Sequence, residues 1–97
     1  MARQPCNYIL ASQKHGALYI GVTSNLAQRL WHHKEGIIEG SSKRYQIYLL
    51  VYFEMFDDMA TAIAREKQLK NWHRDWKCNL IEAHNPAWAD LAPGLGL

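Results

Sequence analysis

Two short apolar segments near the start of the chain constrain its fold most. Residues 6–12 and 17–23 are rich in aromatic and β-branched side chains, and only residues 13–16 separate them. A connection of this length that ends in glycine, here Gly16, is typical of an antiparallel β-hairpin. The sequence therefore predicts a sheet that begins with a hairpin.

Capping residues predict a helix directly after the hairpin. Ser24 and Asn25 are good N-cap residues, residues 26–35 form the body of the helix, and Gly36 is its expected stop. Directly after Gly36, residues 37–44 contain Gly40, Ser41 and Ser42 and are expected to form a mobile loop.

A third strand and two further helices complete the domain. The strand is expected over residues 45–56, and strict alternation would bring one set of apolar side chains to a single face. That set is Ile47, Leu49, Val51, Phe53 and Met55. Helices are predicted from Asp57 or Asp58 to about Trp72 and over residues 74–83. The order β-β-α-β-α-α indicates a small three-stranded α/β domain.

The length of 97 residues allows one hydrophobic core. A chain of this size buries roughly 65% of the surface that its unfolded form exposes, which is too little for two domains. We expect a single domain over residues 1–97, with its core at about 6–83. Residues 84–97 contain two prolines and two glycines, and we expect this tail to add little to the fold.

Composition excludes several classes of protein. The longest nearly apolar run, residues 45–53, is far shorter than the ~20 residues of a membrane-spanning helix. Cys6 and Cys78 form no CxxC pair, which argues against a disulfide framework or a thiolate metal site and favours a cytoplasmic setting. A net charge of +2 permits nucleic-acid binding without requiring it.

One carboxylate occupies an unusual position in the second predicted helix. Glu66 falls in the middle of an apolar stripe formed by Met59, Ala62, Ile63 and Leu69. An ionised carboxylate in such a place costs several kcal/mol unless a cation, a metal ion or strong donors meet it. Three interpretations are open: an ion pair with Arg29, a carboxylate that reaches out at the core edge, or a metal ligand.

Other polar side chains share the same region of the predicted fold. Arg29 and His33 lie one turn apart beside the apolar stripe of the first helix. Tyr8 and Tyr19 can meet across the hairpin, although strand tyrosines are ordinarily core residues. Gly21, inside a strand, indicates close approach by a ligand or by another part of the backbone.

Together these five side chains form a set that can cleave a phosphodiester. A single carboxylate, Glu66, can hold one Mg²⁺, because this ion keeps most of its water ligands. Arg29 can neutralise charge that develops on phosphorus, and a phenol near cations can act as a base toward water. The chain contains neither an HExxH motif nor a nucleophile elbow.

The order of these residues resembles the GIY-YIG nuclease superfamily, and in particular its small single-domain bacterial branch. The resemblance rests on Tyr8-Ile9-Leu10, on the segment Leu18-Tyr19-Ile20-Gly21-Val22-Thr23, on Arg29 and His33, and on residues 64–72. It covers about residues 7–91. It implies a three-stranded antiparallel sheet flanked by helices, hence an α/β (α+β) fold, and metal-dependent hydrolysis of nucleic acid.

The resemblance also assigns roles to individual residues. Tyr8 would be the general base, Tyr19 and His33 would orient water and phosphate, and Arg29 would stabilise the transition state. Glu66 would be the single ligand of Mg²⁺, with Mn²⁺ as a substitute. The first half-motif departs from the family, because Cys6-Asn7-Tyr8 keeps only its tyrosine. A late active-site asparagine could be Asn71, Asn79 or Asn85.

Contacts with the substrate are expected mainly from the loop before the third strand. Lys43 and Arg44 are the candidates for phosphate contact, with Gly21 as a further point of approach. Trp72 and Trp76 lie among basic residues and could stack on bases, but burial in the core is the favoured interpretation.

The expected function is that of an endonuclease acting on DNA in repair or recombination. A targeting protein or a homodimer is open as a further partner. Two alternatives are a nucleic-acid-binding module that does not cleave by itself, and a structural domain with an Arg29–Glu66 ion pair.

Overall fold

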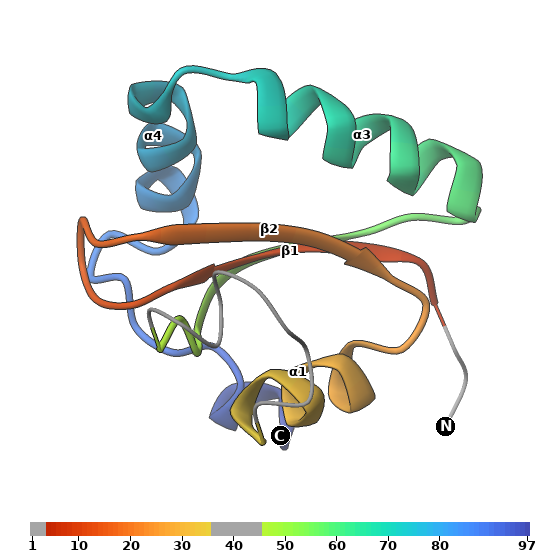
Figure 1. Cartoon of the computed structure of the whole chain (residues 1–97), viewed down its shortest axis with the longest axis horizontal. Helices are drawn as coiled ribbons and strands as arrows, with labels where there is room; N and C mark the ends of the chain where they lie inside the picture. Colours follow the sequence, from red (N-terminus) through yellow and green to blue (C-terminus); the bar gives the residue numbers. More distant parts are fainter. Residues whose placement is uncertain (1–3, 36–45) are drawn as a thin grey trace.

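The computed structural model describes residues 4–35 and 46–97, and Figure 1 shows a sheet with helices on both faces. In chain order its elements are β1 (Cys6–Ala11), β2 (Leu18–Thr23), α1 (Leu26–Lys34), β3 (Leu49–Met55), α3 (Met59–Asn71), α4 (Arg74–His84) and the short 3₁₀ helix η1 (Pro93–Leu95). The order β-β-α-β-α-α and the α+β class confirm the prediction.

The sheet has the strand order β2-β1-β3, and both pairings are antiparallel. The central strand β1 is buried along its whole length, while β2 forms one edge. The helices α3 and α4 cover one face, and α1 together with η1 covers the other (Figure 1). In this register Tyr8 lies opposite Gly21, and Leu10 lies opposite Tyr19.

Side-chain caps begin two of the helices where the sequence predicts them. The Asn25 side chain accepts a hydrogen bond from the Gln28 N–H at the start of α1, and Asp58 accepts one from the Thr61 N–H at the start of α3. The expected stop at Gly36 and the loop over residues 37–44 lie outside the described residues.

The third strand corrects the prediction of strict alternation. In the pairing of β1 with β3, Ile9 lies opposite Tyr52 and Leu10 lies opposite Leu50, so Val51 is the extra residue of a β-bulge. Val51 and Tyr52 therefore pack on the same face of the sheet. The prediction that Ile47, Leu49, Val51, Phe53 and Met55 share one face is wrong, because Leu49 and Val51 belong to one core cluster and Ile47 and Phe53 to the other.

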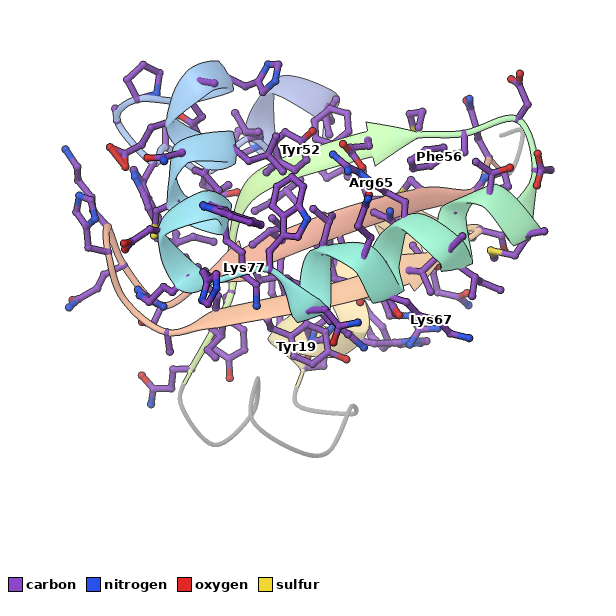
Figure 2. The ribbon with its side chains drawn as sticks, turned by 90° about the horizontal axis from the view of Figure 1, so that it is seen from above. Tyr19, Tyr52, Phe56, Arg65, Lys67 and Lys77 are labelled. Carbon is purple, nitrogen blue, oxygen red and sulfur yellow. The ribbon has the colours of Figure 1, made fainter. Side chains whose placement is uncertain are left out.

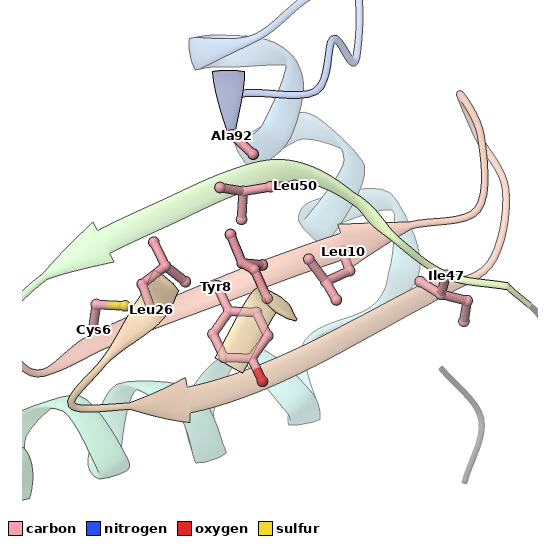
Figure 3. Packing of buried hydrophobic residues seen from close by; sticks show 8 residues of the cluster. Cys6, Tyr8, Leu10, Leu26, Ile47, Leu50 and Ala92 are labelled. Carbon is pink, nitrogen blue, oxygen red and sulfur yellow. The ribbon is translucent and has the colours of Figure 1, made fainter. Parts of the chain in front are cut away.

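Two hydrophobic clusters hold the layers together. The cluster on the α1 face contains Cys6, Tyr8, Leu10, Leu26, Leu30, Ile47, Leu50 and Ala92, most of which Figure 3 labels. The cluster under α3 and α4 contains Ile9, Ala11, Ile20, Val51, Tyr52, Leu69, Ile81 and Trp88. Both faces of the sheet are thus buried, and polar groups that serve chemistry must reach an edge.

The C-terminal tail is part of the fold, contrary to the prediction that it adds little. The Leu91 N–H donates to the Leu50 carbonyl at 2.8 Å, and the Leu50 N–H donates to Asp90 Oδ1 at 3.3 Å. Asn85 Nδ2 donates to the Val51 carbonyl, and Trp88 is buried. The tail therefore covers the β3 edge. Among the described residues, no helix has the length and apolarity needed to cross a membrane.

Candidate active site

Tyr8 lies at the centre of the candidate site, on the α1 face of the sheet. Its side chain is only 1% exposed, and its ring passes over β2 (Figure 3). A Cβ atom added at Gly21 would overlap the hydroxyl and Cζ of Tyr8. The space that glycine leaves is therefore filled by the chain's own tyrosine. Contact of Gly21 with nucleic acid stays a prediction.

Three aromatic rings meet between the hairpin and α1. The Tyr8 hydroxyl lies 3.0 Å from Nε2 of His33, which is buried on α1. The ring of Tyr19 lies edge-on to His33 with centroids 4.8 Å apart, and the rings of Tyr8 and Tyr19 are stacked at 6.3 Å. The helical spacing that predicted His33 beside the core is confirmed.

The protonation states of Tyr8 and His33 follow from their burial. Burial, followed by the charges of Arg29 and His32, lowers the pKa of His33 to about 4, so its imidazole is neutral at pH 7. Burial and then the neighbouring Tyr19 raise the pKa of Tyr8 above its usual range, although Arg29 lowers it. Tyr8 therefore keeps its proton, and its hydroxyl shares a hydrogen bond with Nε2 of the neutral His33, in which the tautomer of the imidazole decides which group donates.

Arg29 contributes charge to the same group of residues. It lies one turn before His33 on α1 and is partly exposed, and its charge acts on both Tyr8 and His33. The guanidinium forms no ion pair with any described residue. Its positive charge is consequently available to a phosphate.

Glu66 reaches this region from α3, on the other side of the sheet. Its side chain is 14% exposed, and its charge is close enough to act on Tyr8. The cation that meets it is Lys70 of the same helix, with Nζ 3.4 Å from Oε2. The ion pair with Arg29 is not formed in the described part of the chain, so that interpretation of Glu66 is wrong.

The surroundings of Glu66 fit a hydrated divalent ion. Lys70 is 52% exposed, so it can leave the carboxylate at little cost. Within residues 4–35 and 46–97, no three His, Cys, Asp or Glu side chains converge as metal ligands. A single carboxylate suits Mg²⁺, which keeps most of its waters, and does not suit an ion such as Zn²⁺ that needs several protein ligands.

The other sequence candidates divide into several groups. Lys43 and Arg44 lie outside the described residues. Trp72 is partly buried, as expected, whereas Trp76 is exposed and the burial prediction for it is wrong. Among the asparagines, Asn85 is buried and holds the tail to β3. Asn71 and Asn79 are exposed.

Sequence analysis missed a polar cluster on the α3 face of the sheet (Figure 2). Arg65 donates to both carboxylate oxygens of Glu54, at 3.1 and 3.2 Å, and Glu54 also accepts from the Tyr52 hydroxyl at 2.6 Å. Burial alone would raise the pKa of Glu54, but these hydrogen bonds lower it overall. The available signal was the spacing of Tyr52 and Glu54 on one face of β3.

The comparisons with known proteins agree with this arrangement. The family described as GIY-YIG catalytic domain matches residues 4–79, which is most of the chain. The chain belongs to this GIY-YIG family. Membership points to nuclease activity, and the matched segment contains the five residues gathered above. The GIY-YIG match ends within α4, so the tail that covers β3 lies beyond it.

Several small proteins are similar to this GIY-YIG chain. A UPF0213 protein of Staphylococcus haemolyticus is 35% identical over 71% of this chain and 84% of its own length. A UPF0213 protein of Clostridium perfringens is 33% identical over 79% of this chain and 84% of its own. A UPF0213 protein of Haloquadratum walsbyi is 32% identical over 68% of this chain and 74% of its own length. No solved structure matches the chain at a comparable level of significance.

Proposed function

We propose that this protein is a metal-dependent endonuclease that hydrolyses phosphodiester bonds of DNA. The observation that carries the proposal is the hydrogen bond between Tyr8 and His33, packed against Tyr19 beside the charge of Arg29, which has no ion pair within residues 4–35 and 46–97. Glu66 acts on the same tyrosine from α3. A phosphate bound at this edge of the sheet would face the Arg29 cation, the partly exposed phenol of Tyr19 and the Glu66 carboxylate.

Glu66 is the residue that would hold Mg²⁺, or Mn²⁺ in its place. When bound, the ion polarises a phosphoryl oxygen and stabilises the leaving oxygen. Arg29 neutralises charge on the non-bridging oxygens, since it has no carboxylate partner among the described residues. With a metal ion on Glu66, the ammonium group of Lys70 would no longer pair with this carboxylate and could contact a phosphate.

We propose Tyr19, in place of the expected Tyr8, as the general base. Tyr8 was the expected base, but it is 1% exposed and its hydroxyl is hydrogen-bonded to the buried His33. Tyr19 is partly exposed and stacks on Tyr8, so water can reach it. We therefore assign proton abstraction from water to Tyr19, and we assign to Tyr8 and His33 the positioning of its ring.

The proposal is tested by cleavage of duplex, single-stranded, flapped and branched DNA, and of RNA. Wild-type protein is compared with Glu66→Ala in Mg²⁺, in Mn²⁺ and in EDTA. We expect metal-dependent cleavage that falls about 100-fold or more in the variant, because it loses the ligand of the ion. Glu35→Ala, which removes an exposed carboxylate at the end of α1, is the matched control and should cleave like wild type.

Two outcomes would contradict the proposal. Equal cleavage by wild type and Glu66→Ala would show that the activity does not come from this site. Binding of DNA without cleavage in either metal would favour the alternative function, a nucleic-acid-binding module that a partner protein directs.

A further inference from the structure

Trp76 on α4 is a large aromatic side chain that the fold leaves in solvent. It is 54% exposed, whereas Trp88 is buried and Trp72 is partly buried. Its ring is nearly perpendicular to the ring of Trp72, with centroids 6.0 Å apart, and to the ring of His73, with centroids 5.4 Å apart. Neither ring is stacked face to face on the indole, and more than half of the Trp76 surface is open to solvent.

The elements around Trp76 hold it in a fixed position. The guanidinium of Arg65 lies 5.1 Å from the ring centroid of Trp72, whose side chain packs on the core under α3 and α4. Arg74, at the start of α4, donates hydrogen bonds to the carbonyls of His15 and Gly16 in the hairpin connection. Because α4 is anchored in this way, a ligand that stacks on Trp76 loses little binding energy to ordering of the protein.

Lysine side chains of α3 and α4 lie in the region between Glu66 and Trp76. Lys70 pairs with Glu66, and Nζ of Lys77 donates to the Lys70 carbonyl at 3.3 Å. Lys67 adds an exposed cation on α3, and Figure 2 labels it together with Lys77. Glu66 and the end of α3 at Asn71 are separated by only about 7 Å along the helix axis. One exposed acid, Asp75, lies in the same region.

The other exposed tryptophan has different surroundings. Trp31 on α1 is 55% exposed, and it borders a shallow depression whose other lining side chains are mostly apolar. These are Ala27, Leu30, Ala92 and Leu97, with Lys34 as the one charged residue. Trp76 thus differs from Trp31 in its cationic setting and not in its exposure.

We infer that Trp76 stacks on a base of an unpaired strand of the substrate, with phosphates of that strand lying along Lys77, Lys70 and Lys67. The inference rests on the proposed nuclease function and adds a substrate class to it. Bases in a duplex are already stacked on each other, so an exposed indole offers them little, whereas an unpaired base gains a stacking partner. The preferred substrate is therefore DNA with a single-stranded segment next to the cleaved bond.

The test measures binding in EDTA, so that cleavage does not interfere. The probes are a fluorescein-labelled oligothymidylate of about 15 nucleotides, near the upper end of usual single-strand site sizes, and a duplex of equal length. Fluorescence anisotropy compares wild type, Trp76→Ala and Trp31→Ala. We expect Trp76→Ala to weaken binding of the single strand by about 5- to 100-fold, and Trp31→Ala to leave it within about 2-fold.

Two results would overturn the inference. One is single-strand affinity in Trp76→Ala equal to that of Trp31→Ala, with both variants melting like wild type. The other is wild-type binding of the duplex as tight as that of the single strand. Metal-dependent duplex cleavage that Glu66→Ala abolishes would leave the nuclease proposal standing in either case. Single-strand binding that depends on Trp76, without any cleavage, would support the stacking surface and contradict the nuclease.

Discussion

The contact between Tyr8 and Gly21 sets the geometry of the candidate site at the scale of single residues. The two residues are opposite each other in the β1–β2 register, and the tyrosine ring occupies the volume that a side chain at position 21 would need. The ring can then reach His33 on α1. Glycine is required here for close packing, since the structure gives no left-handed backbone angle at this position.

Gly21→Ala is expected to destabilise the protein and to impair cleavage. The added methyl group overlaps a buried ring that has no free space to move into, and such overpacking typically costs about 1–3 kcal/mol. Urea unfolding measures the loss of stability, and cleavage assays measure the loss of the Tyr8–His33 contact. Gly94→Ala is the control, because a Cβ at Gly94 meets no atom within 4 Å. Equal stability of the two variants would contradict the packing argument.

The residues of the site could largely be named from the sequence, because periodicity carries the relevant information. Helical spacing placed Arg29 and His33 at the edge of a core, and it placed Glu66 on an apolar stripe. The exposure of each tyrosine could not be read in this way, because it depends on where α1 packs against the hairpin. The burial of Tyr8, and with it the choice of base, required the tertiary structure.

At the scale of elements, β3 shows where sequence patterning fails. Its residues are apolar on both sides, so the alternation of the sequence contains no signal for a bulge. Val51 nevertheless shifts the register between β1 and β3 by one residue. Beyond the bulge, Tyr52 and Glu54 both face α3, where they meet Arg65. Arg65 precedes Glu66 directly in the chain. The ion pair between β3 and α3 thus helps to fix the rotation of the helix that presents Glu66.

Arg65→Met is expected to lower the free energy of unfolding by about 1–3 kcal/mol. Glu54 is only 17% exposed, so removal of its bidentate partner leaves a largely buried carboxylate without a cation. Arg65→Lys should fall between wild type and Arg65→Met, since lysine keeps the charge and loses the fork. Urea unfolding provides the measurement.

Lys70→Met is the control for Arg65→Met. It breaks the pair with Glu66 on the same helix, where the lysine is half exposed, and should cost no more than about 0.5 kcal/mol. An Arg65→Met protein as stable as Lys70→Met would show that the pair between β3 and α3 does not stabilise the fold.

At the scale of the whole molecule, the C-terminal tail packs against the sheet that the N-terminal hairpin begins. The tail returns along β3, where Asp90 and Leu91 exchange hydrogen bonds with Leu50, and Ala92 enters the cluster that contains Tyr8. The prolines and glycines in this segment predicted a tail that adds little to the fold. The buried side chains that it contributes, Trp88 and Ala92, gave no periodic signal because the tail forms no long helix or strand.

The stability of the whole chain is expected to decrease as the pH falls from 7 to 4. Burial, then Arg29 and His32, lowers the pKa of His33 to about 4 from an ordinary value of 6.5. Between these values the unfolded chain binds more protons than the folded chain, so the contribution is complete above pH 6.5 and is lost toward pH 4. A shift of this size corresponds to about 3 kcal/mol at most.

The variant His33→Gln separates this effect from other acid-sensitive groups. Glutamine can still accept the Tyr8 hydrogen bond but does not titrate. Glu54, whose pKa is lowered by its hydrogen bonds, weakens both proteins at lower pH. Urea unfolding at a series of pH values should therefore give a flatter profile for His33→Gln between pH 6.5 and 4, with convergence of the two proteins below it. Parallel profiles would mean that His33 has the same pKa in the folded and the unfolded chain, which would contradict the lowered pKa.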